Sequence, residues 1–248
     1  MCSRIRQNGI DRPGIWAALG AALVLLLSVA VPASAKPYQS GGQWREQLIH
    51  ILGTTMDQSH ETKGIVGEIV VGLQQRQDHH GMEVTFEYAP GDFSLSSQAA
   101  VLTAIDRTAR VAHLNTDSWS VVLTVPQPIT VHGDSLSAMV GLTVVALAKG
   151  DFIFPDRVIT GTVTPDGHIG TVGSLPLKVD AAHKERLRRV LVPEELDVAD
   201  SDWDTPFLMQ ISPVDTVDKA YQALTGRPLD ESASAEDKHS ETAIRLRE

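Results

Sequence analysis

Cysteine is almost absent from this sequence. The one cysteine is Cys2, which lies just before an apolar N-terminal segment. A mature chain that begins after this segment has no disulfide, no cysteine nucleophile and no cysteine-based metal site. Its stability must come from the hydrophobic core, and 248 residues with 42% hydrophobic content suffice for one full core.

Positive charge is also scarce, with 21 Lys and Arg against 31 Asp and Glu. Without residues 1–35, which hold three arginines and one aspartate, the net charge changes from −10 to −12. Nucleic-acid binding relies on Lys and Arg to neutralise phosphates, so nucleic acid is not an expected partner. The sequence contains neither G-x-x-x-x-G-K-[ST] nor G-x-G-x-x-G, so we expect no nucleotide-binding module in it.

Ligands with the spacing of a metal site are missing as well. His79 and His80 follow each other in a polar stretch and have no third ligand at a useful spacing, so we expect a solvated pair. His132 lies near two serines, where a histidine at the rim of a site is the simpler interpretation. We expect neither a metal nor a cofactor.

The N-terminus has the order of an export signal. Three arginines precede residues 14–31, which hold no charge, and small residues at positions 33–35 offer a cleavage site. Residues 1–35 are therefore expected to be a signal peptide. The stretch 14–35 is also close to the ~20 residues that span a bilayer, so an uncleaved membrane anchor is the alternative. In either case the chain from Lys36 is expected to be exported, periplasmic or secreted.

The rest of the chain mixes strand and helix patterns. A lead-in segment, residues 36–63, is expected to hold a short amphipathic helix, and a charged tail, residues 227–248, is expected to be disordered. Between them, residues 64–226 are expected to form a single α+β domain. Strands are predicted at 65–73 and 82–88, as a hairpin or neighbouring pair, and at 119–125, 157–164, 168–172, 189–192 and 207–211; helices are predicted at 96–113, 136–149, 177–188 and 214–224.

Two separated segments carry residues suited to catalysis. The letters D-S-L-S-A at residues 134–138 place two hydroxyls and a carboxylate before an apolar helix. Taken alone, Asp134 or Ser135 is an ordinary helix N-cap there. The second segment runs from Thr160 to Lys178, a lysine at the start of a predicted helix. Taken alone, Lys178 is an ordinary solvated lysine.

Together the two segments resemble the proteolytic domain of Lon proteases. That family has D-G-P-S-A around its nucleophile, then T-G-E-[IV]-T and a glycine loop [IV]-G-G-[LV]-K-x-K that ends on the catalytic lysine. V-G-S-L at residues 172–175 falls on the glycine loop. The resemblance places Ser137 on the nucleophile and Lys178 on its base, with Thr160 and Asp134 in supporting positions. It covers nearly all of the expected domain and implies the ribosomal protein S5 domain 2-like fold.

The sequence departs from the family pattern around these residues. Glycine and proline before the serine, a glycine after it, the glutamate of T-G-E and the first lysine of K-x-K are replaced by Ser135, Leu136, Met139, Thr162 and Pro176. The serine, the lysine, the aspartate and the threonine all remain. The departures therefore bear on substrate preference and on the geometry of the oxyanion site.

A lysine can take the proton of a serine hydroxyl only when its own amine is neutral. Burial and the positive end of a helix dipole both favour the neutral amine over the ammonium form. We therefore expect Lys178 to be buried at the start of its helix, bonded to Thr160 and within reach of Ser137. Backbone N–H groups around Ser137 are the expected oxyanion donors.

The resemblance implies a serine endopeptidase that works through a Ser137–Lys178 dyad and an acyl-enzyme intermediate. We expect short, flexible or unfolded peptides as substrates and no requirement for ATP. Rings are common in the family, so a homo-oligomer is open. The same fold occurs in modules that only bind or assemble, which makes an inert binding domain the first alternative.

A second alternative is a GDSL-type esterase that uses Ser135. G-D-S-L at residues 133–136 spells the motif of those enzymes, and Asp180 and His183 have their D-x-x-H spacing. In that family the serine block lies near the mature N-terminus and D-x-x-H lies far downstream, unlike the arrangement in this sequence. We therefore expect no contact between Ser135 and His183.

Overall fold

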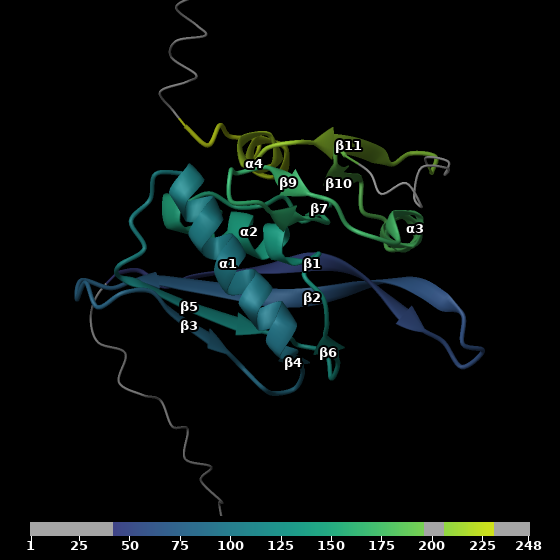
Figure 1. Ribbon diagram of the computed structural model, residues 1–248, viewed down its shortest axis with the longest axis horizontal. Helices are drawn as coiled ribbons and strands as arrows, with labels where there is room; N and C mark the ends of the chain where they lie inside the picture. The colour runs from purple at the N-terminus through teal and green to yellow at the C-terminus, as the bar shows by residue number, and fades with distance from the viewer. Residues whose placement is uncertain (1–41, 196–205, 231–248) are drawn as a thin grey trace, which may run out of the picture. The chain divides into compact units, whose positions relative to one another are not determined.

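Residues 42–195 and 206–230 are the part of the chain that the computed structural model describes (Figure 1). They belong to one unit, residues 40–248. The expected signal or anchor, residues 1–35, and most of the expected tail, residues 227–248, lie outside the described residues. No helix within the described ranges combines the length and the apolar character that a membrane crossing needs.

The main sheet of the described residues has four strands in the order β1-β2-β5-β3. Their bounds are β1 Arg45–Met56, β2 Thr62–Gln75, β3 Glu83–Phe86 and β5 Trp119–Thr124. β1 and β2 form a long antiparallel hairpin, with Arg45 opposite Leu73 at one end and Met56 opposite Thr62 at the other. β5 pairs antiparallel with β2, and β3 pairs parallel with β5.

Three smaller sheets and the helices complete the described fold. A parallel sheet has the order β11-β10-β7, while β4 pairs with β6 and β8 with β9. The strands are β4 Asp92–Phe93, β6 Thr130–Val131, β7 Arg157–Ile159, β8 Thr162–Val163, β9 Ile169–Gly170, β10 Arg189–Pro193 and β11 Gln210–Val214; the helices are α1 Leu95–Val111, α2 Ser137–Lys149, α3 Leu175–Lys184 and α4 Val217–Thr225. The chain is thus mixed α/β, which confirms the predicted combination of strands and helices.

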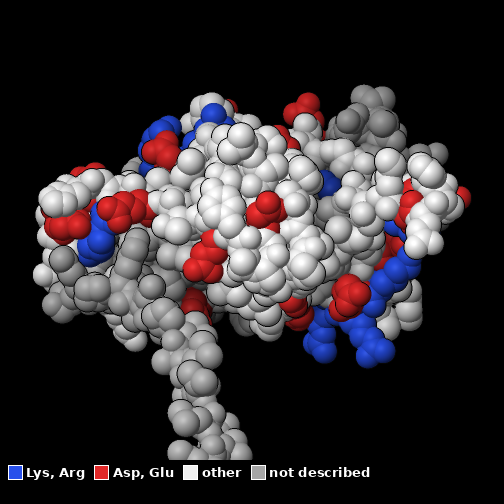
Figure 2. Space-filling view, turned by 90° about the horizontal axis from the view of Figure 1, so that it is seen from below, with Lys and Arg blue, Asp and Glu red and all other residues white. Residues whose placement is uncertain are grey.

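The helices lie on one side of the main sheet, as Figure 1 shows. Figure 2 shows the molecule from below, where the sheet faces away from the helices. Asp and Glu side chains are scattered across the middle of this view, whereas Lys and Arg lie toward its margins. The basic groups therefore form no continuous patch on this face.

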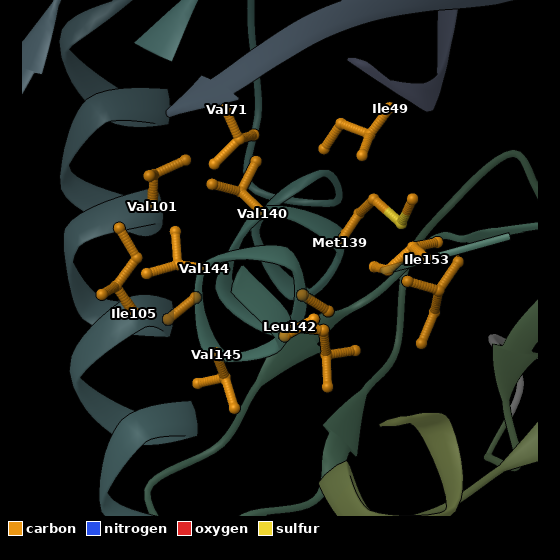
Figure 3. Close-up of a cluster of buried hydrophobic side chains, with 14 of the residues drawn as sticks. Ile49, Val71, Val101, Ile105, Met139, Val140, Leu142, Val144, Val145 and Ile153 are labelled. Carbon is orange, nitrogen blue, oxygen red and sulfur yellow. The ribbon is translucent and has the colours of Figure 1, made fainter. Parts of the chain in front are cut away.

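Helix α2 is the central element of the core. Every residue from Ser137 to Leu147 is buried, as expected of a helix that is apolar on all sides. Figure 3 shows Val140 beside Val71 of β2 and Val101 of α1, and Val144 beside Ile105 of α1. The close contact with α1 depends on Gly141, because a Cβ there would lie 2.7 Å from Thr108 Oγ1 and 2.9 Å from Ala104 O. Gly150, in the left-handed region with φ 81°, ends the helix as predicted.

The predicted helix in the lead-in segment is wrong, because this segment contributes β1. Leu48, Ile49, Ile51 and Leu52 have the i, i+1, i+3, i+4 spacing of a helix face. In the structure they occupy two faces of a strand: Ile49 and Ile51 enter the main core, and Leu52 enters a second cluster with Val158 of β7. A strand with apolar contacts on both faces reproduces the spacing of an amphipathic helix.

The predicted pairing of residues 65–73 with 82–88 is also wrong. These stretches form β2 and β3, but β5 lies between them in the sheet. β5 buries Trp119, Val121 and Leu123, whereas the residues of β3 alternate between exposed and half-buried. The more apolar strand takes the central position, and β3 takes the edge.

Candidate active site

Ser137 is the first residue of α2, and only 2% of its surface is exposed. The residue before it, Leu136, occupies the cap position, and no side chain caps the helix. The interpretation of Asp134 or Ser135 as an N-cap is therefore wrong. Asp134 contributes its main-chain carbonyl, which accepts a hydrogen bond from the Ser137 N–H at 2.9 Å, while the residue itself is exposed. This turn fixes the start of the helix.

Two backbone hydrogen bonds tie the serine turn to Gly161. The Gly161 N–H donates to Ser135 O at 2.8 Å, and the Ala138 N–H donates to Gly161 O at 3.1 Å. A Cβ at Gly161 would lie 2.7 Å from Cγ2 of Ile169, so the close passage of the chains requires glycine. Ser137 is thereby held beside the residue that follows Thr160.

The predicted strand at residues 157–164 is interrupted at this point. β7 ends at Ile159 and β8 begins at Thr162, which leaves Thr160 and Gly161 between two strands. The Thr160 N–H donates to Leu191 O of β10 at 3.1 Å, while Gly161 bonds to the serine turn. The two residues therefore connect the parallel sheet to the start of α2.

Lys178 reaches the same place from α3. The helix begins at Leu175, two residues earlier than predicted, so Lys178 is its fourth residue. Lys178 is 5% exposed, and its Nζ donates a hydrogen bond to Oγ1 of the fully buried Thr160 at 3.3 Å. The expected burial of Lys178 and its bond to Thr160 are both present. Burial removes water from an ammonium group and disfavours its charged form.

Helix α3 is held in position by close packing against β2. A Cβ at Gly64 would lie 1.8 Å from Leu177 O and 3.0 Å from Cβ of Ala181. On its other side, α3 joins the second apolar cluster through Leu175 and Val179. The first turn of α3, which carries Lys178, therefore lies between the hairpin and the parallel sheet.

A cavity of about 350 Å³ opens beside Lys178. Its walls come from β1, β2, the segment before α2 and the turn before α3. The lining residues are Ile51, Leu52, Gly53, Thr54, Ile65, Gly67, residues 129–133, Ser135, Leu136, Gly173, Ser174 and Lys178. Lys178 and His132 are the ionisable side chains of this lining, and the rest of it is apolar or neutral. Largely apolar walls with a few polar groups are typical of a binding cavity.

The expected oxyanion donors are engaged within the protein. The N–H of Ser137 bonds to Asp134 O, and the N–H of Ala138 bonds to Gly161 O. The prediction that amides around Ser137 point at a bound substrate is therefore wrong for these two groups. The Ser137 amide closes the turn that starts the helix, and the Ala138 amide holds this turn against Gly161.

The D-x-x-H pair of the esterase interpretation is not assembled. Asp180 accepts a hydrogen bond from Lys184 Nζ at 2.5 Å on the exposed side of α3. His183 Nε2 lies 3.2 Å from Phe207 O and is exposed, whereas Ser135 lines the cavity. Asp180 therefore orients a lysine and not the histidine.

Within residues 42–195 and 206–230, no group of three or more His, Cys, Asp or Glu side chains is placed to hold a metal ion. His79 has an exposed side chain, and its Nδ1 lies 3.5 Å from Ser118 Oγ. His132 is exposed and lies at the cavity wall, which places it at the rim as expected.

Comparison with known proteins adds an independent observation. The model of the Lon protease (S16) C-terminal proteolytic domain matches residues 77–225, a range that includes Ser137, Thr160 and Lys178. Lon protease homolog 2, peroxisomal, of Caenorhabditis briggsae is 35% identical to this chain over 98 residues. The match covers 38% of this chain and 13% of that protein. The similarity to this relative thus concerns a small part of its length.

Proposed function

This chain belongs to the family of Lon protease (S16) C-terminal proteolytic domains, and we propose that it is a serine endopeptidase with Ser137 as nucleophile and Lys178 as base. The mixed α/β fold is in keeping with the ribosomal protein S5 domain 2-like class, which we propose for it. The observation that carries the proposal is the burial of Lys178 with its Nζ bonded to Thr160, next to the residue that holds the Ser137 turn. A solvated helix-end lysine would have no such environment.

In the proposed mechanism, the neutral amine of Lys178 takes the proton of Ser137 as Oγ bonds to the carbonyl carbon of the scissile peptide. The resulting ammonium gives this proton to the leaving nitrogen when the C–N bond breaks. Water then attacks the acyl-enzyme, Lys178 takes a proton from it, and Ser137 leaves with a proton returned to Oγ. Thr160 accepts a hydrogen bond from the amine and so holds it in one orientation.

The cavity indicates the physical state of the substrate. About 350 Å³ with largely apolar walls accommodates a few residues of an extended chain and excludes a folded domain. We propose short or unfolded polypeptides as substrates. Hydrolysis by this chain needs no ATP in this proposal, because its sequence contains no phosphate-binding loop. We also propose that the protein acts outside the cytoplasm, either as a free protein or anchored to the membrane.

An inert binding domain is the second candidate function. It is favoured by the two amides at Ser137 and Ala138, which bond within the protein and cannot stabilise an oxyanion at the same time. If either amide is to stabilise the oxyanion, Asp134 O must release the Ser137 N–H or Gly161 O must release the Ala138 N–H when substrate binds. Reactivity of Ser137 distinguishes the two candidates.

The test combines covalent labelling with substrate hydrolysis. A fluorophosphonate, which reacts with activated serines, should label Ser137 in a peptide-mapping experiment, and the chain should hydrolyse fluorescein-labelled β-casein without ATP. Lys178→Ala should lower hydrolysis by roughly 10²–10⁴-fold, the usual contribution of a general base. Lys184→Ala, on the same helix but with a 71% exposed side chain, is the matched control and should leave it unchanged.

Two results would contradict the assignment. Near-normal turnover in Lys178→Ala would show that Lys178 is not the base of Ser137. Labelling of Ser135, together with activity that survives Ser137→Ala, would favour the alternative of a GDSL-type esterase that uses Ser135. The double variant of Ser137 and Lys178 should be hardly worse than either single one, because residues that act as one unit are not additive.

A further inference from the structure

Ser174 has an unusual backbone conformation for its position. It is the N-cap residue of α3, with φ 60° and ψ 33° in the left-handed region. N-cap residues normally have extended backbones and use their side chains to cap the helix. Ser174 makes no such side-chain bond. Glycine adopts the left-handed conformation without steric cost, whereas a residue with a Cβ is strained in it.

The left-handed residues at the helix ends differ from Ser174 in their role. His113 and Arg186, with φ 52° and 60°, are exposed and follow the ends of α1 and α3. The left-handed conformation is common after the C-terminus of a helix, where it satisfies the last carbonyls. At the N-terminus of α3 it has no such role. The strain at Ser174 is therefore not explained by helix termination.

The position of Ser174 is in the wall of the cavity. It lines the cavity together with Gly173 and Lys178, and its carbonyl accepts a hydrogen bond from the Lys178 N–H at 3.2 Å. Residues four apart lie on the same side of a helix, one turn from each other. Ser174 is thus one turn from Lys178, the residue proposed as the base, and both line the cavity.

We propose that Ser174 is a substrate-binding residue whose hydroxyl hydrogen-bonds a peptide group of the chain held in the cavity. This inference rests on the proposed peptidase function. A peptide that enters a cavity with largely apolar walls leaves N–H and C=O groups unpaired, which is unfavourable unless the wall supplies partners. A serine hydroxyl is both donor and acceptor and serves either group. Glycine would remove the backbone strain but would supply no partner.

The experiment separates the hydroxyl from the backbone. Binding of fluorescein-labelled β-casein is measured by anisotropy in the Ser137→Ala chain, which cannot form the acyl-enzyme. Ser174→Ala keeps the Cβ and the strain but loses the hydroxyl, and Ser174→Gly loses both. Both should weaken binding to the same extent, roughly three- to tenfold, as for the loss of one hydrogen bond. Ser174→Gly should also raise the Tm, and Ser174→Ala should not.

Arg186→Gly is the matched control, since it relieves the same backbone conformation at the far end of α3. It should raise the Tm and leave binding unchanged. Unchanged binding in Ser174→Ala, or no casein binding at all, would overturn the inference. Loss of binding in Ser174→Gly alone would assign the effect to a looser backbone and overturn it too. If Ser174 affects binding but the unmodified chain neither hydrolyses casein nor is labelled, the peptidase proposal fails and the Ser174 site stands.

Discussion

Substitution of Gly64 by alanine should displace the helix that carries Lys178. An added Cβ would lie 1.8 Å from Leu177 O, whereas real Cβ contacts essentially never come below 3.0 Å. Because the clashing atom is backbone, α3 and β2 must separate by about 1.2 Å to reach that limit. A misplacement of ~1 Å in an active site can lower the rate by about 10²-fold. We expect hydrolysis in Gly64→Ala to fall by this order.

The effect on stability should be modest by comparison. Overpacking typically costs about 1 to 3 kcal/mol. In a domain of this size each kcal/mol lowers the Tm by roughly 2–4 °C. We therefore expect Gly64→Ala to remain folded with a lower Tm, because the main core around α2 does not include Gly64. Calorimetry measures the Tm, and the casein assay measures hydrolysis.

The control for Gly64 lies on the neighbouring strand. An added Cβ at Gly53 would lie 3.6 Å from Cγ1 of Ile65, an ordinary contact, so Gly53→Ala should leave the Tm nearly unchanged. Gly53 lines the cavity, so its variant serves for stability alone. If Gly64→Ala kept both the Tm and the hydrolysis rate of the unmodified chain, the contact of β2 with α3 would not be what positions Lys178.

Two further predictions concern stability and pH. Tyr221→Phe removes the 2.7 Å hydrogen bond from a buried hydroxyl to Asp151, whose carboxylate keeps its ion pair with Arg227. The free energy of unfolding should fall by about 1 to 2 kcal/mol, with hydrolysis unchanged. Calorimetry that found no loss of stability would show that this bond between α4 and the residue after the cap of α2 does not stabilise the fold. Lys63, together with hydrogen bonds in the hairpin turn, lowers the pKa of Asp57 to about 2. The ionised Asp57 therefore stabilises the turn at pH values above the ordinary pKa of a carboxyl group, and the turn should loosen as the pH falls through about 2. NMR should show this change as a shift of the neighbouring amide signals, and the shift should be absent in Asp57→Asn.

Long apolar patterns made the core helices readable from the sequence. Residues 136–148 are mostly apolar and hold no charge, and Gly150 follows Lys149, so α2 and its end were predictable. α1 was predictable from its spacing and from three candidate N-caps, Ser94, Ser96 and Ser97, of which Ser94 caps the helix with its side chain. Within α1 the buried face was less certain, since Leu102 is 39% exposed whereas Val101 is buried. Local periodicity predicts the presence of a helix better than it predicts which face of the helix is buried.

The order of the strands depends on contacts that no local pattern contains. β5 lies in the sheet between β2 and β3. Its Leu123 is opposite Val71 of β2, about fifty residues earlier in the sequence, and opposite Phe86 of β3, thirty-seven residues earlier. Local pattern predicts that each strand exists, and comparative burial decides which one is central. The engaged amide of Ala138 escaped prediction for the same reason, because its acceptor, Gly161, is distant in sequence.

The interruption between β7 and β8 is the step that turns a stable fold into a candidate site. An unbroken strand through Thr160 and Gly161 would direct both residues into one ladder. Here Thr160 bonds by its main chain to β10 and by its side chain to Lys178, and Gly161 bonds to the serine turn. Two neighbouring residues thus join the parallel sheet, α2 and α3. A Cβ at position 161 would lie 2.7 Å from Cγ2 of Ile169 but at an ordinary 3.8 Å from Cβ of Ala138, so a side chain there would displace Ile169 from the residue that holds the serine turn.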